Sequence, residues 1–126
     1  MSKPPDFYRA FAQSHPDVAA AYEGLASACR AAGPLDSKTV ALVKLSIAIG
    51  AGTEGSTHSH ARRALAAGIS PAELEHVALL AITTLGFPRA MAGLAWIRDV
   101  TEKPGPRMRR RVTSSTPARG TSRRLR

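Results

Sequence analysis

Apolar residues recur at helical spacing along most of the first hundred residues. Val18, Tyr22, Leu25 and Cys29 stand at i, i+4, i+7 and i+11, which is the stripe of an amphipathic helix with one buried face. Similar patterns, bounded by glycine and proline, predict five or six helices in total. The predicted helices cover about residues 5–12, 16–33, 36–49, 53–68, 71–86 and 88–100.

Local start and stop signals fix several of these boundaries. Asp36 is placed to cap a helix, and the sequence SPAE at 70–73 is a capping box with proline at the first helical position. Gly68 is expected to end the preceding helix, with Ile69 packing back on its last turn.

The same pattern predicts which side chains are buried. Lys44 and Ser46 are the polar exceptions in the second half of helix 36–49, so we expect protein to surround this helix nearly all round. Cys29 lies on the apolar stripe and is interpreted as a small buried hydrophobe rather than a reactive thiol. Small residues in helix 88–100 should let a neighbouring backbone approach closely. An alanine-rich chain with few aromatic residues is consistent with an all-α, compact bundle.

Charge divides the chain into two parts. The chain has 126 residues and a formal charge of +9, yet residues 1–102 hold nine Lys/Arg and nine Asp/Glu. The last 24 residues hold the other nine Lys/Arg and no acid, among proline, glycine and serine. We therefore predict a helical domain over 1–103 and a disordered basic tail over 104–126.

The composition also limits the compartment and the partners. One cysteine cannot form an internal disulfide, and the sequence contains no apolar run of about 20 residues. We expect no secretory leader, and therefore a cytoplasmic protein without a membrane partner. The tail can attract nucleic acid through counterion release. It lacks stacking aromatics and the domain lacks a basic stripe, so nucleic acid is expected only through residues 104–126. A purely solubilising tail is the alternative.

Most of the usable polar chemistry lies between residues 53 and 68. On a helix, Glu54 and His58 share a face at i, i+4, whereas His60 lies about 200° round from His58, on the side of Ser56. The full set of candidate site residues is Glu54, Ser56, His58, His60, Arg62 and Arg63.

Residues 35–100 carry a resemblance to a known family. The segment LDSKTVALVKLSIAIGAG is followed by HARRALAAGISPAELEHVALLAITTLGFPRAMAGL, in which His60, Gly68, Glu73 and Gly86 recur at the family spacing. This stretch resembles the carboxymuconolactone decarboxylase and alkyl hydroperoxidase D superfamily. The resemblance implies an all-helical fold and a homo-oligomer, a trimer or a hexamer.

The chain departs from the peroxidase branch of that superfamily. That branch carries Cys-x-x-Cys-x-x-x-His, and counting back from His60 places Thr53 and Ser56 at the two cysteine positions. Ala41 occupies the position of the branch's glutamate. A hydroxyl forms neither a thiolate nor a disulfide, so the sequence argues against thiol peroxidase activity.

The decarboxylase branch needs neither cysteine nor cofactor, and the resemblance therefore implies a lyase or related acid–base enzyme without cofactor or metal. We expect His60 to be the proton shuttle, with Glu54 and His58 as the other catalytic residues. Arg62, Arg63 and Ser56 are predicted to bind a small carboxylated or lactone substrate. Because Glu54 and His60 lie on different sides of a helix, a shared pocket requires a bend after Gly55 or a neighbouring subunit.

Several alternatives stay open at this point. Glu54 and His58 can be a solvated ion pair, or they can join His60 in a metal set, for which Zn²⁺ is the first choice. The histidines diverge on a straight helix, which argues against that set. Arg62 and Arg63 can line a subunit contact, and the protein can be a catalytically silent oligomer.

Overall fold

The structure is a computed structural model that describes residues 6–102, and this part of the chain is helical, without strands. The prediction of an all-α fold is confirmed, whereas the predicted basic tail, residues 104–126, lies outside the described residues. The six helices are α1 (Asp6–Ser14), α2 (Pro16–Ala31), α3 (Ser37–Ala51), α4 (Glu54–Ala66), α5 (Pro71–Leu85) and α6 (Phe87–Thr101).

The local boundary signals behave as the sequence predicts. The Asp36 carboxylate accepts a hydrogen bond from the Thr39 N–H at 2.8 Å and caps α3. Ser70 and Glu73 form the reciprocal capping box at the start of α5. After α4, Gly68 takes a positive φ of 87°, and the buried Ile69 follows it. These turns set how α3, α4 and α5 follow one another.

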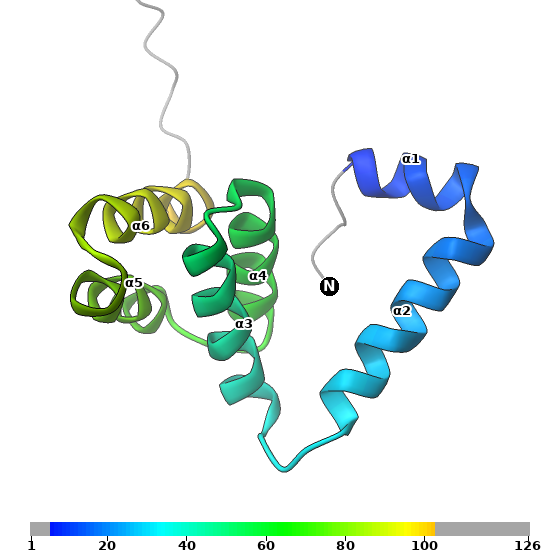
Figure 1. Cartoon of the computed structure of the whole chain (residues 1–126), viewed down its shortest axis with the longest axis horizontal. Coiled ribbons are helices and arrows are strands. Elements are labelled where there is room, and N and C mark those ends of the chain that lie inside the picture. Colours follow the sequence, from blue (N-terminus) through cyan, green and yellow to red (C-terminus); the bar gives the residue numbers. More distant parts are fainter. Residues whose placement is uncertain (1–5, 103–126) are drawn as a thin grey trace, which may run out of the picture.

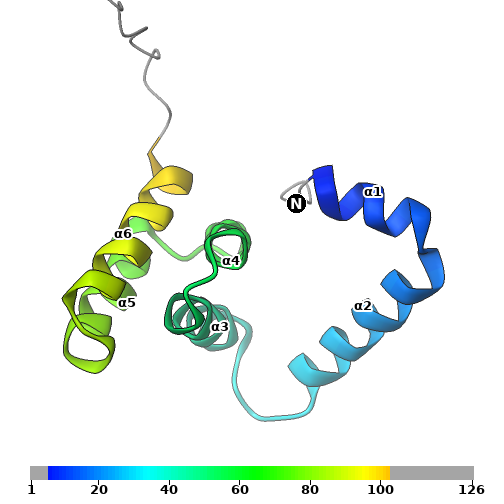
Figure 2. The same ribbon diagram turned by 45° about the horizontal axis from the view of Figure 1, so that its top comes forward.

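Helices α3 to α6 form a four-helix bundle that contains the core (Figures 1 and 2). Helix α6 packs against α5 and α4, and α3 packs against α4 and α5. At the α3–α6 contact Gly93 lies so close to Ile49 that a Cβ at Gly93 would be 2.7 Å from Ile49 Cγ2. The atoms nearest to Gly93 belong to the Ile49 side chain, so α6 is closely packed there, whereas close approach of a neighbouring backbone stays a prediction. The core cluster consists of Leu45, Ile49, Ala61, Ala64, Ile69, Leu74, Ala78, Ala81, Ala90 and Ile97.

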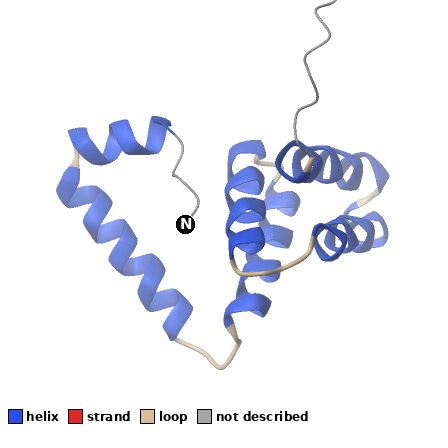
Figure 3. Ribbon diagram, turned by 180° about the vertical axis from the view of Figure 1, so that it is seen from behind, coloured by secondary structure: helices blue, strands red, loops and turns tan. Residues whose placement is uncertain are grey.

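Helices α1 and α2 meet at an open angle and form a two-helix unit, called the hairpin below, that stands beside the bundle and is joined to it by residues 32–36 (Figures 1 and 3). They pack on each other, and Ala19 is their one buried residue in the described part of the chain. The predicted burial of the α2 stripe, Cys29 included, is wrong for the single chain. Tyr22 is 60% exposed and Leu25 62%, because no other helix within residues 6–102 covers this face.

The prediction that protein surrounds α3 nearly all round is also wrong for the single chain. Its bundle side is buried, but Ile47 is 64% exposed and Val43 40%. With Leu80 and Leu85 of α5 these side chains line an apolar groove of about 460 Å³ between the two helices. The sequence shows that α3 is apolar on most sides, but residues 6–102 bury only one of them.

None of the helices within residues 6–102 has the length and apolar character that crossing a lipid bilayer demands.

Candidate functional site

Helix α4 carries all six residues that the sequence predicts for the site. Its buried face consists of Thr57, Ala61 and Ala64, which lie against the rest of the bundle. The Thr57 hydroxyl donates a hydrogen bond to the carbonyl oxygen of Thr53 at 2.8 Å, so this polar side chain is satisfied within its own helix. The helix runs without interruption from Glu54 to Ala66, and the two flanks of the buried face therefore point in different directions.

One flank of α4 borders a pocket of about 680 Å³ between the hairpin and the bundle. Ser56, His60, Arg62 and Arg63 reach it from α4, which brings four of the six predicted residues together. Lys44 of α3 lies on the bundle side as well. The hairpin contributes polar and apolar side chains, among them Tyr8, Ala19, Tyr22, Glu23 and Ala26.

His60 is the titratable group whose environment matters most in this pocket. Burial, followed by the positive charges of Lys44 and Arg63, lowers the pKa of the His60 imidazole below its ordinary value of 6.5. The ring is half-buried. A neutral imidazole in a cationic pocket can accept a proton near pH 7 while its neighbours attract an anion.

The hairpin wall of the pocket has its own polar contact. The Tyr8 hydroxyl of α1 donates a hydrogen bond to the Glu23 carboxylate of α2 at 2.6 Å, which raises the pKa of Tyr8. The sequence pattern did not indicate Tyr8, Glu23 or Lys44 as pocket residues. Lys44 had a signal, because it is a charged residue in an apolar helix, whereas the other two became recognisable only when the hairpin was placed.

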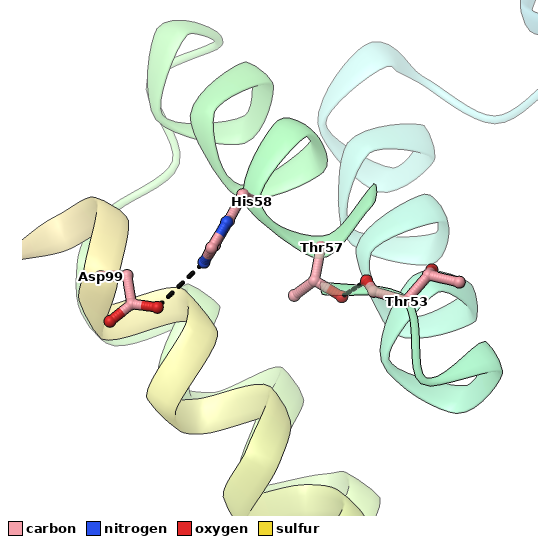
Figure 4. A network of polar contacts seen from close by, with 4 residues as sticks. All are labelled: Thr53, Thr57, His58 and Asp99. Carbon is pink, nitrogen blue, oxygen red and sulfur yellow. Dashed lines mark hydrogen bonds and ion pairs between the residues drawn. The ribbon is translucent and has the colours of Figure 1, made fainter. Parts of the chain in front are cut away.

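Glu54 and His58 lie on the other flank of α4, next to α6. His58 Nε2 is 2.9 Å from Oδ2 of Asp99, and Figure 4 shows the two side chains pointing at each other across the α4–α6 contact. Glu54, His58 and Asp99 are the set within residues 6–102 that could hold a metal ion, with ligand atoms all within 4.8 Å of one another. Asp99 was not predicted, because nothing local in the sequence links it to a residue 41 positions earlier.

Glu54 and His60 do not share a pocket within residues 6–102, so the predicted bend after Gly55 is wrong, whereas a shared pocket completed by a neighbouring subunit stays a prediction. Gly55 lies inside a continuous α4 and introduces no bend, so the angular separation calculated from the sequence persists in the fold. His60 borders the pocket, and Glu54 belongs to the cluster with Asp99. The catalytic and substrate-binding roles assigned to the six residues stay predictions.

Comparison with known proteins gives one match. The family model described as carboxymuconolactone decarboxylase family matches residues 16–99, which is 84 of the 126 residues and spans α2 to most of α6. No curated protein and no solved structure matches the chain.

Proposed function

Because the chain belongs to the carboxymuconolactone decarboxylase family, we propose that it is a cofactor-free lyase or related acid–base enzyme acting on a small carboxylated or lactone substrate. The observation that carries this proposal is the half-buried His60, with its lowered pKa, beside Lys44 and Arg63 in a pocket of about 680 Å³. A volume of this order suits a small molecule.

The proposed chemistry divides the pocket residues by charge. Lys44, Arg62 and Arg63 attract the substrate carboxylate, and an arginine can hold it through two parallel hydrogen bonds. When the carbon–carbon bond to the carboxylate breaks, CO2 leaves and its electron pair delocalises into the conjugated carbonyl. The resulting anion is stabilised by the same cations and then takes a proton at carbon.

His60 is the proposed proton shuttle for that last step. Because its pKa is lowered, the His60 imidazole binds a proton less readily than an ordinary histidine, but the imidazolium is a stronger acid, which suits delivery of a proton to carbon. Ser56 and Ser59 line the same pocket and can donate hydrogen bonds to a lactone oxygen. We place this activity in the cytoplasm, because a chain with one cysteine has no internal disulfide to maintain.

The test measures decarboxylation of enol-lactone acids and related small carboxylates by CO2 release. We expect His60→Ala to lower turnover by a factor of roughly 10² to 10⁴, the usual contribution of a general acid–base residue. His60→Gln, which keeps a hydrogen bond but cannot shuttle protons, should be no better. His76→Gln is the matched control, because His76 is exposed on α5 and outside the pocket.

Two results would contradict the proposal. Wild-type protein that decarboxylates none of these acids would remove the lyase function. Full activity in His60→Gln would remove the role of His60, whatever the reaction.

A further inference from the structure

We propose that Glu54, His58 and Asp99 form a binding site for a divalent transition metal ion, with Zn²⁺ as the preferred ion. The three side chains come from two helices, α4 and α6, and their ligand atoms lie within 4.8 Å of one another. The cluster lies on the opposite flank of α4 from the His60 pocket, so this site is separate from the proposed lyase function.

The donor set is of the kind that zinc binds. It offers one imidazole nitrogen and two carboxylate oxygens, and zinc accepts nitrogen and oxygen donors in tetrahedral geometry. Mg²⁺ and Ca²⁺ prefer oxygen donors, in larger number, so the histidine selects against them. Glu54 and Asp99 are exposed, which leaves the fourth position open to water.

The distances are close to those of an occupied site. Tetrahedral zinc with ligands at about 2.0–2.1 Å separates its donor atoms by about 3.3 Å. His58 Nε2 and Asp99 Oδ2 are 2.9 Å apart, and no pair in the set exceeds 4.8 Å. A small rotation of the Asp99 side chain would therefore lengthen its distance to His58 to that of a zinc site. A small rotation of Glu54 would bring its carboxylate to the same ion.

The scaffold holds the histidine in place. His58 follows the buried Thr57, whose hydroxyl is bonded to the Thr53 carbonyl (Figure 4), and its side chain is 23% exposed. Ala61 on α4 and Ile97 on α6 are fully buried, so the two backbones that carry the ligands are packed rather than mobile loops. A preorganised imidazole loses little entropy when it binds a metal.

Electrostatics also favours a cation at this point. Glu54 and Asp99 bring two carboxylates near each other, and like charges repel. A proton on His58 adds one positive charge, whereas a divalent ion offsets both carboxylates and leaves the imidazole neutral as a ligand. The bound ion would join the start of α4 to the end of α6.

The experiment titrates Zn²⁺ into the full-length, chelator-treated and tag-free protein by isothermal calorimetry. We expect one ion per chain with micromolar or tighter affinity. Loss of a group that hydrogen-bonds to a metal ligand typically weakens metal binding about 10–100-fold. Because His58→Gln and Asp99→Asn change the ligands themselves, each should weaken Zn²⁺ binding at least about tenfold. His60→Gln and His76→Gln are the matched controls and should bind as wild type.

Circular dichroism tests whether each variant is folded. If His58→Gln does not fold, Glu54→Gln replaces it as the ligand variant, because Glu54 is exposed in the first turn of α4. Co²⁺ substitution provides a second readout, an absorption spectrum of a tetrahedral site that disappears in the ligand variants. Absence of binding to wild type would overturn the proposal. So would binding that survives His58→Gln or that His60→Gln abolishes.

Discussion

His58 and His60 are separated by one residue, yet they face different parts of the molecule. Because α4 is a regular helix, two residues of separation turn a side chain by about 200°. His60 reaches the cationic pocket, and His58 pairs with Asp99. The angular divergence was predictable from the sequence, but the partner of each histidine depends on packing between helices and was not.

The positive charge of Lys44 is predicted to influence the pKa of His60. Removing the positive charge in Lys44→Met should raise the pKa of His60 toward 6.5, because that charge disfavours the imidazolium. NMR titration of the ring protons measures the change. Lys38→Met on the same helix is the control and should leave the His60 titration as in wild type. Equal pKa values in wild type and Lys44→Met would show that the charge has no influence there.

The same shift links His60 to stability. In the unfolded chain the histidine binds a proton more readily than in the fold, so protonation favours unfolding. The free energy of unfolding that is linked to His60 is therefore at its full value above 6.5, the pKa of histidine in the unfolded chain. It falls as the pH falls through the lower pKa that His60 has in the fold. Urea unfolding across this range should show that His60→Gln reduces the loss of stability at low pH.

At the scale of the helix, interactions between residues close in sequence were sufficient to predict that each helix forms and where it begins and ends. The caps at Asp36 and Ser70 involve neighbours three residues away, and such contacts can be identified from the sequence. Burial is different, because an apolar stripe shows that a face favours a partner but does not show whether the same chain supplies it. The exposed α2 stripe, with Tyr22, and the exposed side of α3, with Ile47, are the consequence.

Two glycines in helices should respond in opposite ways to alanine. In Gly93→Ala the new methyl would lie 2.7 Å from Cγ2 of the fully buried Ile49, and overpacking of this kind costs about 1–3 kcal/mol. Better helix propensity offsets up to about 1 kcal/mol of it. In Gly24→Ala nothing lies within 4 Å, so the free energy of unfolding should rise by up to about 1 kcal/mol.

Urea unfolding of the two variants measures this difference directly. A Gly93→Ala protein as stable as Gly24→Ala would mean that α3 and α6 are packed less tightly than the structure shows.

At the scale of the whole molecule, the balance of positive and negative side chains over residues 1–102 was predictable by counting, and the place of the hairpin was not. Whether α1 and α2 fold onto the bundle or beside it depends on tertiary contacts across the 32–36 linker. The pocket around His60 exists because the hairpin stands beside the bundle. The site could therefore be assigned to the correct helix from the sequence, but not to its second wall.

We expect the protein to assemble into a trimer or a hexamer. The α2 stripe and the α3–α5 groove are apolar surfaces that a monomer exposes, and such surfaces are typical of subunit contacts. Leu80→Glu should place a charge in the groove and lower the molar mass measured by light scattering. Thr83→Glu, an exposed change on the same helix outside the groove, is the control. A monodisperse wild-type monomer at micromolar concentration would contradict this expectation.

The division into hairpin and bundle also has a consequence for synthesis on the ribosome. The hairpin is translated first, and the bundle comprises the following 65 residues, 37–101. Synthesis of residues 32–101, at roughly 5–20 residues per second, takes about 4–14 s after α2 is complete. The finished bundle does not cover the apolar stripe of α2, in which Tyr22 and Leu25 stay exposed. The stripe is therefore open to other nascent chains and to chaperones from that time until a neighbouring subunit covers it. Residues 37–101 then fold through contacts between helices close in sequence, a topology that favours rapid folding.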